Sequence, residues 1–460
     1  MEGIRHQHIH FVGIGGSGMS GIAEVLLNMG YRISGSDIVE NEATKKLAAL
    51  GARIFIGHDS TNVLGADVLV VSSAIEKRNV ELLAAEERRI SIIPRAEMLK
   101  ELMRLKFGIA ISGTHGKTTT TSLICWILAK AGLDPTMVIG GKFFNIGGSA
   151  RLGQGRYLVA EADESDGSFL KLSPIIAVVT NIDLEHLDYF HGLERIEEAF
   201  LEFINNVPFY GKAILGIDNL YLRSLLPRIK KRFVTYGFEH RPQIMAQEIE
   251  ARGLHSEFNV IKENNLLGRV RINVPGLHYI NNALAAIAVG LELEIDFKII
   301  KEAIGSYRNV ERRFQILGEE GNILFLDDYA HHPTEIEVTL RTVRVAWPNQ
   351  RIVTIFQPHR YTRTKFLWKN FAQCFNESDI VIITEIYPAG EASIEGIKAD
   401  LVVKSVKEAG HPNIKYIRDL DETIEYLKRI IQKGDLVITL GAGDIYRVGQ
   451  GLLEYLKEKE

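Results

Sequence analysis

Cysteine is scarce in this sequence. The 460 residues include only Cys125 and Cys374, too few for a disulfide framework or for a zinc cluster built on cysteines. Each stands among apolar residues with helical spacing, so we interpret both as buried free thiols. The composition therefore excludes a small disulfide-stapled scaffold and a cysteine-ligated zinc protein.

The chain also lacks an excess of either charge. Its 54 lysines and arginines and 58 aspartates and glutamates leave a formal net charge of -4, so we expect no basic surface for nucleic acid. No apolar run approaches the roughly 20 residues that a membrane-spanning helix needs. The first six residues show no charged-then-apolar signal pattern. We therefore expect a cytosolic protein with neither a nucleic-acid nor a membrane partner.

What the chain does have is enough apolar sequence for several cores. Hydrophobic residues make up 46% of it and charged residues 24%, as in ordinary globular proteins. Its length suits about three domains of roughly 150 residues. Runs typical of strands alternate with helical patterns, which predicts parallel sheets covered by helices. We expect three α/β domains in series: a Rossmann-like domain over 1–106, a central P-loop ATPase domain with a mostly parallel sheet over 107–311, and a Rossmann-like domain over 312–460.

The expected strands fall into three series. The first is His8–Ile14, Arg32–Gly35, Arg53–Ile56, Val68–Ser72 and Ile90–Ile93; the second is Phe107–Gly113, Tyr157–Ala162 and Ile175–Asn181; the third is Ile323–Asp327, Arg351–Phe356, Ile380–Thr384, Ile414–Ile417 and Leu436–Leu440. We predict helices between them, such as Thr334–Trp347 and Asp421–Gln432. Residues 241–275 have few helix signals and predict short antiparallel strands.

A glycine-rich loop follows the first expected strand. Gly13, Gly15 and Gly18 match the spacing G-x-G-x-x-G, and an amphipathic helical pattern comes next. In dinucleotide-binding folds such a loop places a pyrophosphate at the helix start, and an acid about 20 residues later binds a ribose. Asp37 stands at about that distance. Taken alone, this stretch favours a nicotinamide-dependent oxidoreductase.

A second phosphate-type loop, GTHGKTTTT, follows the strand that opens the middle region. Gly113 and Gly116 let the backbone turn tightly and point its N–H groups inward. Lys117 supplies a cation for phosphate, and the threonine hydroxyls after it suit Mg²⁺. Because Ile111 occupies the place of the first glycine of the common P-loop, we interpret this loop as a shortened variant that binds ATP. Two phosphate loops predict two phosphorylated ligands, which weakens the oxidoreductase interpretation.

Acidic residues gather at the ends of two expected strands of the middle region. The first strand leads into Glu161, Asp163, Glu164 and Asp166, and the second into Asn181, Asp183, His186 and Asp188. Oxygen-rich groups of this kind suit a hard cation such as Mg²⁺. We favour Glu161 over Glu164 as a metal ligand because it continues its strand. We favour a functional role for His186 because it lies among acids at a strand end.

Together these segments resemble the Mur ligase family. The matching stretches include HFVGIGGSGMSGIAEVL, SGSD, VVSSAI, GTHGKTTTT, EADESDGSF, VTNIDLEHLDY, NALAAIAV, RRFQ, DDYAHHPTE, FQPHRYTRT and GAGDI, and they span the chain from His10 to Ile445. The resemblance implies an ATP-dependent amide ligase of peptidoglycan precursor synthesis, either a monomer or a homodimer. It is greatest to the members that join L-alanine to UDP-N-acetylmuramate. In that reaction ATP phosphorylates the lactyl carboxylate, and the alanine amine then attacks the acyl phosphate.

The resemblance also implies roles for individual residues. The expected contacts of the UDP-sugar are Gly15, Gly16, Ser17, Gly18, Asp37, Ser72, Ser73 and Arg151. The expected ATP site comprises Gly113, Thr114, His115, Gly116, Lys117, Thr118, Thr119, Asn282, Arg313 and Asp328. The expected Mg²⁺ ligands are Thr118, Glu161 and His186, and the expected catalytic residues are Lys117, His186, Arg313, His332 and Arg360. The C-terminal domain is expected to close over ATP and the amino acid, which keeps water from the acyl phosphate.

Two positions depart from the family pattern, and other interpretations stay open at this point. Tyr279 in GLHYINNALAA and Ser149 in GGSARLG each stand where the family commonly has asparagine. A sibling ligase that attaches a tripeptide to the same sugar nucleotide shares most motifs, although GIGGSGMSG favours the alanine-adding enzyme. A P-loop kinase or ATPase leaves the first glycine loop unexplained. An NAD oxidoreductase leaves the second loop unexplained. A regulatory nucleotide sensor leaves the acidic residues and histidines without a function.

Overall fold

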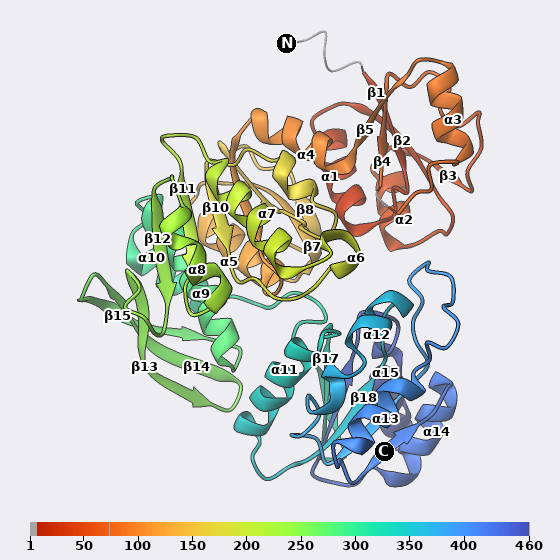
Figure 1. Cartoon of the computed structure of the whole chain (residues 1–460), viewed down its shortest axis with the longest axis vertical. Coiled ribbons are helices and arrows are strands. Elements are labelled where there is room, and N and C mark those ends of the chain that lie inside the picture. Colours follow the sequence, from red (N-terminus) through yellow and green to blue (C-terminus); the bar gives the residue numbers. More distant parts are fainter. Residues whose placement is uncertain (1–6, 73, 460) are drawn as a thin grey trace. The chain divides into compact units, whose positions relative to one another are not determined.

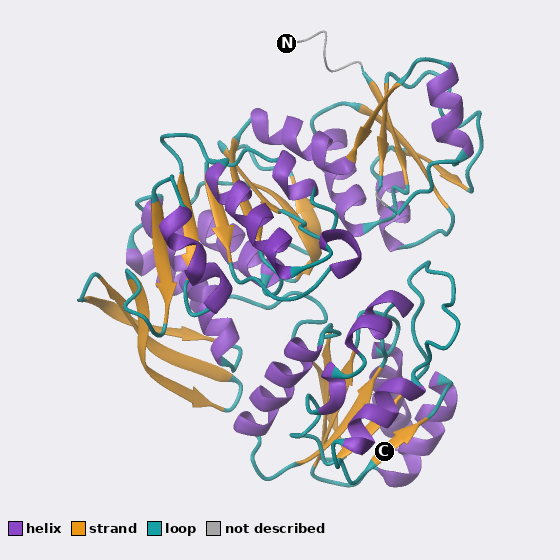
Figure 2. Ribbon diagram, viewed as in Figure 1, coloured by secondary structure: helices purple, strands orange, loops and turns teal. Residues whose placement is uncertain are grey.

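The computed structural model describes residues 7–72 and 74–459. These residues form two compact units, each built from more than one stretch of the chain. Figure 1 labels their helices and strands where there is room. Unit 1 comprises the chain up to Gln247 together with Phe258–Val270 and Asn281–Arg308; unit 2 comprises Glu248–Glu257, Arg271–Ile280 and the chain from Asn309 onward. Helices and strands alternate along most of the chain (Figure 2).

The first sheet belongs to unit 1. Its elements are β1 (His8–Val12), α1 (Ser17–Asn28), β2 (Arg32–Asp37), α2 (Glu42–Ala49), β3 (Arg53–Ile56), β4 (Val68–Val71), α3 (Val80–Glu87), β5 (Ser91–Pro94) and α4 (Arg95–Arg104). All five strands are parallel, in the order β3-β2-β1-β4-β5. Successive residues of β1 point to opposite faces, so Phe11 packs in the core beneath α1 and Val12 in a second core beneath α3. The strand order reverses between β1 and β4, where open α/β sheets bind ligands.

The second sheet is the largest. Its strands are β6 (Phe107–Ser112), β7 (Thr136–Phe143), β8 (Gly148–Arg151), β9 (Tyr157–Glu161), β10 (Ile176–Val179), β11 (Lys212–Gly216), β12 (Phe233–Gly237), β13 (Ile244–Arg252), β14 (His255–Lys262) and β15 (Asn265–Ile272), and its helices are α5 (Lys117–Lys130), α6 (Leu187–Phe190), α7 (Leu193–Asn205), α8 (Leu220–Leu225), α9 (Leu277–Glu292) and α10 (Phe297–Gly305). The order is β15-β14-β13-β12-β11-β10-β6-β9-β7-β8. The strands from β13 to β7 pair in parallel, and β8 pairs antiparallel with β7.

The third sheet belongs to unit 2. Its elements are β16 (Gln315–Glu320), β17 (Ile323–Asp328), α11 (Pro333–Ala346), β18 (Arg351–Phe356), α12 (Tyr361–Leu367), β19 (Ile380–Ile383), α13 (Asp400–Glu408), β20 (Ile414–Tyr416), α14 (Leu420–Ile430), β21 (Asp435–Leu440) and α15 (Tyr446–Lys459). The order is β16-β17-β21-β18-β19-β20. Only the edge strand β16 is antiparallel to its neighbour. Leu427 of α14 and Leu452 of α15 pack with Val353 and Val437 of the sheet in one apolar core.

The three mostly parallel sheets, met in chain order, confirm the predicted α/β fold class. The first strand ends earlier than predicted, at Val12, because the N–H groups of Gly13 and Ile14 turn to the carbonyl of Ser36, at 2.9 and 3.0 Å. The prediction lacked β7, β8, β11, β12 and β16. Residues 241–275 do contain strands, but β13 to β15 are longer than expected. Among the residues that the structure describes, no helix has the length and apolar character for crossing a membrane.

Candidate functional site

The first glycine loop lies at the carboxyl end of β1. Gly13 has a φ of 81°, in the left-handed region that glycine adopts readily. The carboxylate of Asp37, at the end of β2, accepts a hydrogen bond from the Gly15 N–H at 2.8 Å. Asn41 Nδ2 donates to the Gly15 carbonyl at 3.3 Å. The end of β2 and the start of α2 therefore fix the shape of the loop.

Helix α1 begins directly after this loop and has no side-chain cap. Its N-cap residue is Gly16, and its first turn contains no acidic residue. The N–H groups at a helix start have no partner within the helix, and the helix dipole makes them attract anions. Arg95, the first residue of α4, lies against Gly18, and a Cβ at Gly18 would collide with its guanidinium. The loop, the helix start and the arginine together suit an anionic ligand.

Of the remaining predicted contacts of the UDP-sugar, Ser72 lies next to the first glycine loop. Ser72 follows β4, and its Cβ lies 3.4 Å from the position of a Cβ built on Gly13. Arg151, at the end of β8, instead forms an ion pair with Asp134 at 2.6 Å. Ser73 lies outside the described residues. Ser17 opens α1, but its side chain is not among those described.

A cleft of about 440 Å³ in unit 1 borders the first loop. Its lining includes Gly15 and two lysines that the sequence interpretation missed, Lys46 of α2 and Lys142 of β7. Lys46 pairs with Glu24 of α1 at 2.8 Å, and Lys142 approaches Glu42 at 3.5 Å. No local pattern marks these lysines, because only the fold brings β7 to the first glycine loop.

The second phosphate loop connects β6 to α5. Gly116 has a φ of 82°, and a Cβ on it would lie 2.5 Å from Asn282 Oδ1, so this position requires glycine. Like α1, α5 begins after a glycine, with no side-chain cap and no acid in its first turn. Thr119 is buried in that first turn. The structure thus brings the predicted ATP contact Asn282 next to an uncapped helix start.

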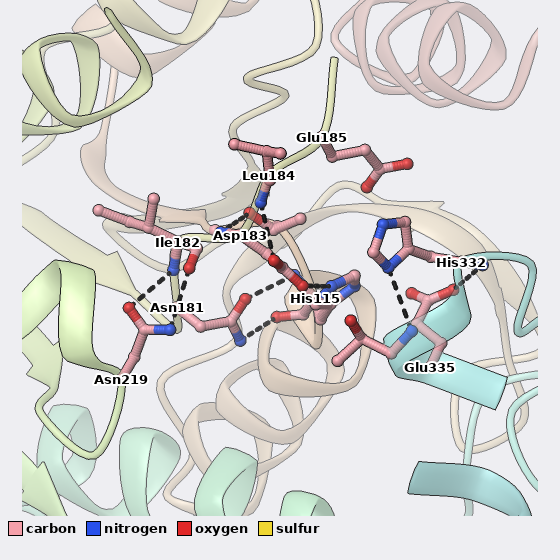
Figure 3. A network of polar contacts seen from close by, with 12 residues as sticks. His115, Asn181, Ile182, Asp183, Leu184, Glu185, Asn219, His332 and Glu335 are labelled. Carbon is pink, nitrogen blue, oxygen red and sulfur yellow. Dashed lines mark hydrogen bonds and ion pairs between the residues drawn. The ribbon is translucent and has the colours of Figure 1, made fainter. Parts of the chain in front are cut away.

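The end of the neighbouring strand β10 holds this loop (Figure 3). Asn181 Oδ1 accepts a hydrogen bond from the His115 N–H at 2.8 Å, and its Nδ2 donates to the His115 carbonyl at 3.0 Å. The imidazole of His115 pairs with the carboxylate of Asp183 at 3.1 Å. The Asp183 N–H donates to Thr114 Oγ1 at 2.8 Å. Asn181 and Asp183, which follow β10, therefore fix the shape of this loop.

Lys117 is the first residue of α5, and oxygen atoms surround its ammonium group. Its Nζ donates to the carbonyls of Gly113 and Thr114 at 2.6 and 3.2 Å and to Glu164 Oε1 at 2.7 Å. Burial alone would lower the pKa of Lys117, but the carboxylates of Glu164 and Asp163 outweigh burial and raise this pKa. Lys117 is therefore a fixed cation beside the loop, as stabilisation of phosphate charge requires.

Glu164, which the sequence interpretation placed second to Glu161 as a metal ligand, contacts Lys117. Its side chain is buried, and Oε1 lies 2.7 Å from Lys117 Nζ and 3.8 Å from His186 Nε2. Its Oε2 has no hydrogen-bond partner among the described residues. Burial raises the pKa of Glu164, and the attraction of Lys117 offsets this only in part. A buried polar atom without a partner is rare in folded proteins and calls for an explanation, such as a bound ion or ligand.

Glu161 lies at the carboxyl end of β9. Its Oε2 accepts a hydrogen bond from Thr118 Oγ1 at 3.2 Å, and its Oε1 accepts one from the Gly140 N–H at 2.6 Å. A hydroxyl and a carboxylate from neighbouring elements form an oxygen donor set that fits Mg²⁺. His186, the third predicted ligand, has a φ of 55°. Functional sites often hold a non-glycine residue in such a strained conformation.

Unit 2 contains two further predicted ATP contacts, Arg313 and Asp328, in a buried charged group. Burial alone would lower the pKa of Arg313, but Glu335 and Asp328 outweigh it and raise this pKa. The two oxygens of Asp328 accept hydrogen bonds from the N–H groups of Phe314 and Ala330, both at 2.7 Å. Burial raises the pKa of Asp328 to about 6, although Arg313 opposes the shift. Asp328 therefore holds the backbone next to Arg313 as well as balancing its charge.

His332 and Arg360 each stand at the start of a helix in unit 2. His332 is the N-cap of α11, where its Nδ1 accepts a backbone N–H of the first turn at 3.3 Å and Glu335 completes a capping box. Arg360 precedes α12 with a φ of 70°, which strains a residue that bears a side chain. The neighbouring His359 stacks on Tyr387, with ring centroids 5.8 Å apart. The structure thus gives His332 a capping role, and its part in catalysis stays a prediction.

Tyr279, which departs from the family pattern, is buried in unit 2. Its ring packs edge-on against Phe314, with centroids 6.4 Å apart, and its hydroxyl accepts a hydrogen bond from Asn309 Nδ2 at 3.2 Å. Burial lowers the pKa of the preceding His278 to about 4, so this ring is neutral at pH 7. Asn281, in unit 1, has a buried Oδ1 without a hydrogen-bond partner in the described part of the chain. The tyrosine therefore serves core packing, and Asn281 retains an open acceptor.

Comparisons with known proteins agree with one another. The family models described as "Mur ligase family, catalytic domain", "Mur ligase middle domain" and "Mur ligase, glutamate ligase domain" match residues 8–107, 111–290 and 312–443. The UDP-N-acetylmuramate–L-alanine ligases of Geobacter sp. (strain M21) and Geotalea daltonii are 51% and 52% identical to this chain, over 98% of both chains in each case. The solved UDP-N-acetylmuramate-alanine ligase of Thermotoga maritima has a TM-score of 0.84 and 30% identity, covering 99% of this chain and 100% of its own. A murein peptide ligase of Psychrobacter arcticus has a TM-score of 0.73 and 25% identity, over 98% of both chains.

Proposed function

The chain belongs to the Mur ligase family, and on that premise we propose that it joins L-alanine to UDP-N-acetylmuramate while ATP is converted to ADP and phosphate. Relatives with about half of their residues identical carry that name. A carboxylate is a poor electrophile, so ATP first phosphorylates it to an acyl phosphate. The alanine amine attacks the carbonyl carbon, and the tetrahedral intermediate expels phosphate. The product, UDP-N-acetylmuramoyl-L-alanine, is a cytoplasmic peptidoglycan precursor.

One observation carries this proposal. Unit 1 contains two glycine loops, and each leads into a helix start without a side-chain cap. Each helix start has a cation beside it, Arg95 for α1 and Lys117 for α5. Two anion sites of this kind suit a sugar-nucleotide diphosphate and the phosphates of ATP. A kinase or ATPase without a nucleotide-linked substrate needs only the second.

We assign the ATP phosphates to the loop from Gly113 to Gly116, where Lys117 neutralises charge that develops on the transferred phosphoryl group. Thr118, Glu161 and His186 are the residues that would hold Mg²⁺. When bound, this ion supplies further charge neutralisation for the phosphates. Glu164 keeps the ammonium group of Lys117 in place through its 2.7 Å contact. Asn281 and Asn282 offer amide groups for the adenine or ribose.

We further assign Arg313 and Asp328 to contacts with ATP, and His332 and Arg360 to the reacting centre and the alanine pocket. In this proposal the C-terminal domain closes over ATP and the amino acid, because an acyl phosphate exposed to water is hydrolysed. X-ray scattering of the protein with and without nucleotide and sugar substrate measures this step. Identical scattering profiles in the two states contradict closure.

The reaction is tested by phosphate release from ATP and Mg²⁺ in the presence of UDP-N-acetylmuramate, with and without L-alanine, and with product masses measured. We expect release that depends on L-alanine and a product heavier by one alanyl residue. Release that requires a peptide in place of alanine identifies the tripeptide-adding sibling instead. No release with any amino acid or peptide, together with firm NAD binding, overturns the proposal.

A further inference from the structure

Arg95 lies at the ligand-binding edge of the first sheet, although no motif marked it. It follows Pro94, the last residue of β5, so it stands at the same sheet edge as the glycine loop after β1. The crevice outside the carboxyl ends of parallel strands is where open α/β sheets bind ligands. The guanidinium lies against Gly18 in the first turn of α1, in the space that a Cβ would fill.

The partner of Arg95 belongs to the second sheet. Arg95 Nη2 donates to Asp163 Oδ2 at 3.1 Å, and Asp163 lies in the acidic loop after β9. The side chains of Arg95 and Asp163 keep 27% and 39% of their surface exposed. The ion pair therefore joins the start of α1 to the acidic loop after β9, and a solute can reach it.

We propose that Arg95 is a specificity-determining residue that exchanges Asp163 for the diphosphate of the sugar nucleotide. This inference rests on the proposed function, since the diphosphate is that of UDP-N-acetylmuramate. A guanidinium binds phosphate oxygens through two parallel N–H···O bonds. The uncapped N–H groups of α1 attract the same anion. Asp163 Oδ2 occupies one of the guanidinium N–H groups until the diphosphate displaces it.

The test measures UDP binding by calorimetry, with UDP itself as the probe, in the full-length protein without ATP. Arg95→Met keeps part of the apolar stem and removes the charge. We expect UDP to bind about 10- to 100-fold more weakly, because hydrogen bonds between charged groups are lost. In turnover the KM for UDP-N-acetylmuramate rises by a similar factor, while kcat at saturation and the KM for ATP change little. Arg104→Met is the matched control, because Arg104 stands at the other end of α4 with 66% of its side chain exposed and pairs with Glu101; it leaves UDP affinity unchanged.

A second variant distinguishes substrate binding from a structural ion pair. Asp163→Asn removes the competing carboxylate and can still accept the Ser165 N–H, which Asp163 Oδ1 accepts at 3.1 Å. We expect UDP to bind several-fold more tightly to this variant, opposite in sign to Arg95→Met. A purely structural pair predicts instead that both variants lose thermal stability and UDP affinity together. If Arg95→Met does not fold, Arg95→Lys takes its place, with an intermediate loss of UDP affinity expected.

Three results separate the possible failures. Unchanged UDP affinity in Arg95→Met, or in Arg95→Lys where that variant replaces it, overturns the inference while leaving the proposed function intact. Parallel weakening in the arginine variant and in Asp163→Asn also overturns it. A wild-type protein that neither binds UDP nor converts UDP-N-acetylmuramate overturns the proposed function itself.

Discussion

Lys117 and Glu164 form one buried ion pair whose contributions to stability and to catalysis can be separated. Nζ and Oε1 lie 2.7 Å apart, and the side chains of Lys117 and Glu164 are only 20% and 3% exposed. Lys117→Met removes the cation and leaves the carboxylate buried, with Oε2 already lacking a partner in the described structure. Breaking a buried pair in this way costs about 3–5 kcal/mol. The double variant Lys117→Met with Glu164→Gln removes the stranded charge, so we expect it to regain most of that loss.

The sign of the pH dependence follows from the same contacts. In Lys117→Met, Glu164 keeps the effect of burial and loses the opposing cation, so its folded-state pKa lies further above its unfolded value. An acid with a raised folded-state pKa favours the folded state at low pH, and this contribution is lost as pH rises through that pKa. The stability deficit of the single variant therefore shrinks on acidification. The double variant has no carboxyl group at position 164 and shows no such recovery.

Catalysis separates from stability in these two proteins. Both lack the cation beside the phosphate loop, so we expect phosphate release to fall by at least about 100-fold in both. Urea unfolding followed by circular dichroism measures the change in stability between pH 5 and 8, roughly the range in which folded proteins are most stable. ATP-dependent phosphate release measures the loss of turnover. A Lys117→Met protein as stable as wild type refutes the stability argument. A double variant with restored turnover refutes the role of Lys117 at the phosphates.

Three further changes test other parts of unit 1. Burial alone would raise the pKa of Glu81, but His10, Ser36 and Asn62 outweigh it and lower it from 4.5 to about 2. A pKa lowered by about 2.5, at about 1.36 kcal/mol for each pH unit, corresponds to about 3 kcal/mol of unfolding free energy. This stability is present above pH 4.5 and lost toward pH 2, so melting curves of Glu81→Gln and wild type should differ at pH 7 and converge in acid. Gly116→Ala places a Cβ on a residue with a positive φ and moves that atom towards Asn282. We expect the unfolding free energy to fall by about 1–2 kcal/mol and the KM for ATP to rise. An unchanged KM for ATP contradicts the ATP assignment. Glu161→Gln should raise the Mg²⁺ concentration for half-maximal rate at least about tenfold, and an unchanged Mg²⁺ titration removes Glu161 from the metal site.

The two glycine-rich loops and the helices after them could be predicted from the sequence because their signals are local. A run of apolar residues, a glycine at a positive φ and a helix start follow one another within a few positions at Gly13 and again at Gly116. Strands with a strong apolar pattern were predicted equally well, and Arg53–Ile56 and Arg351–Phe356 have the predicted limits. In such segments the composition and the tertiary contacts favour the same structure.

Two of the strands that the prediction lacked lie at the edge of a sheet, although the edge strand Arg53–Ile56 was predicted. Gln315–Glu320 has the sequence QILGEE, and none of its residues is fully buried. Its strand conformation comes from antiparallel pairing with β17 rather than from its own residues, because strand propensity depends strongly on context. The short strand Gly148–Arg151 is a second case, since it exists through its pairing with β7.

The contacts of Glu161 and Glu164 show which parts of the acidic segment could be predicted from the sequence. Glu161 was preferred because it continues β9, and the structure does place it against Thr118. Glu164 lies past the strand end, where no periodic pattern applies, and its partner Lys117 is 47 positions away. The partner of Asp163 in the same loop is 68 positions away. Lys117 and Glu164 meet because the parallel neighbours β6 and β9 bring their carboxyl ends to one edge of the second sheet. Arg95 and Asp163 instead come from different sheets. Three carboxylates close together in the sequence therefore have three different partners: Glu161 contacts the hydroxyl of Thr118, Asp163 the guanidinium of Arg95, and Glu164 the ammonium group of Lys117.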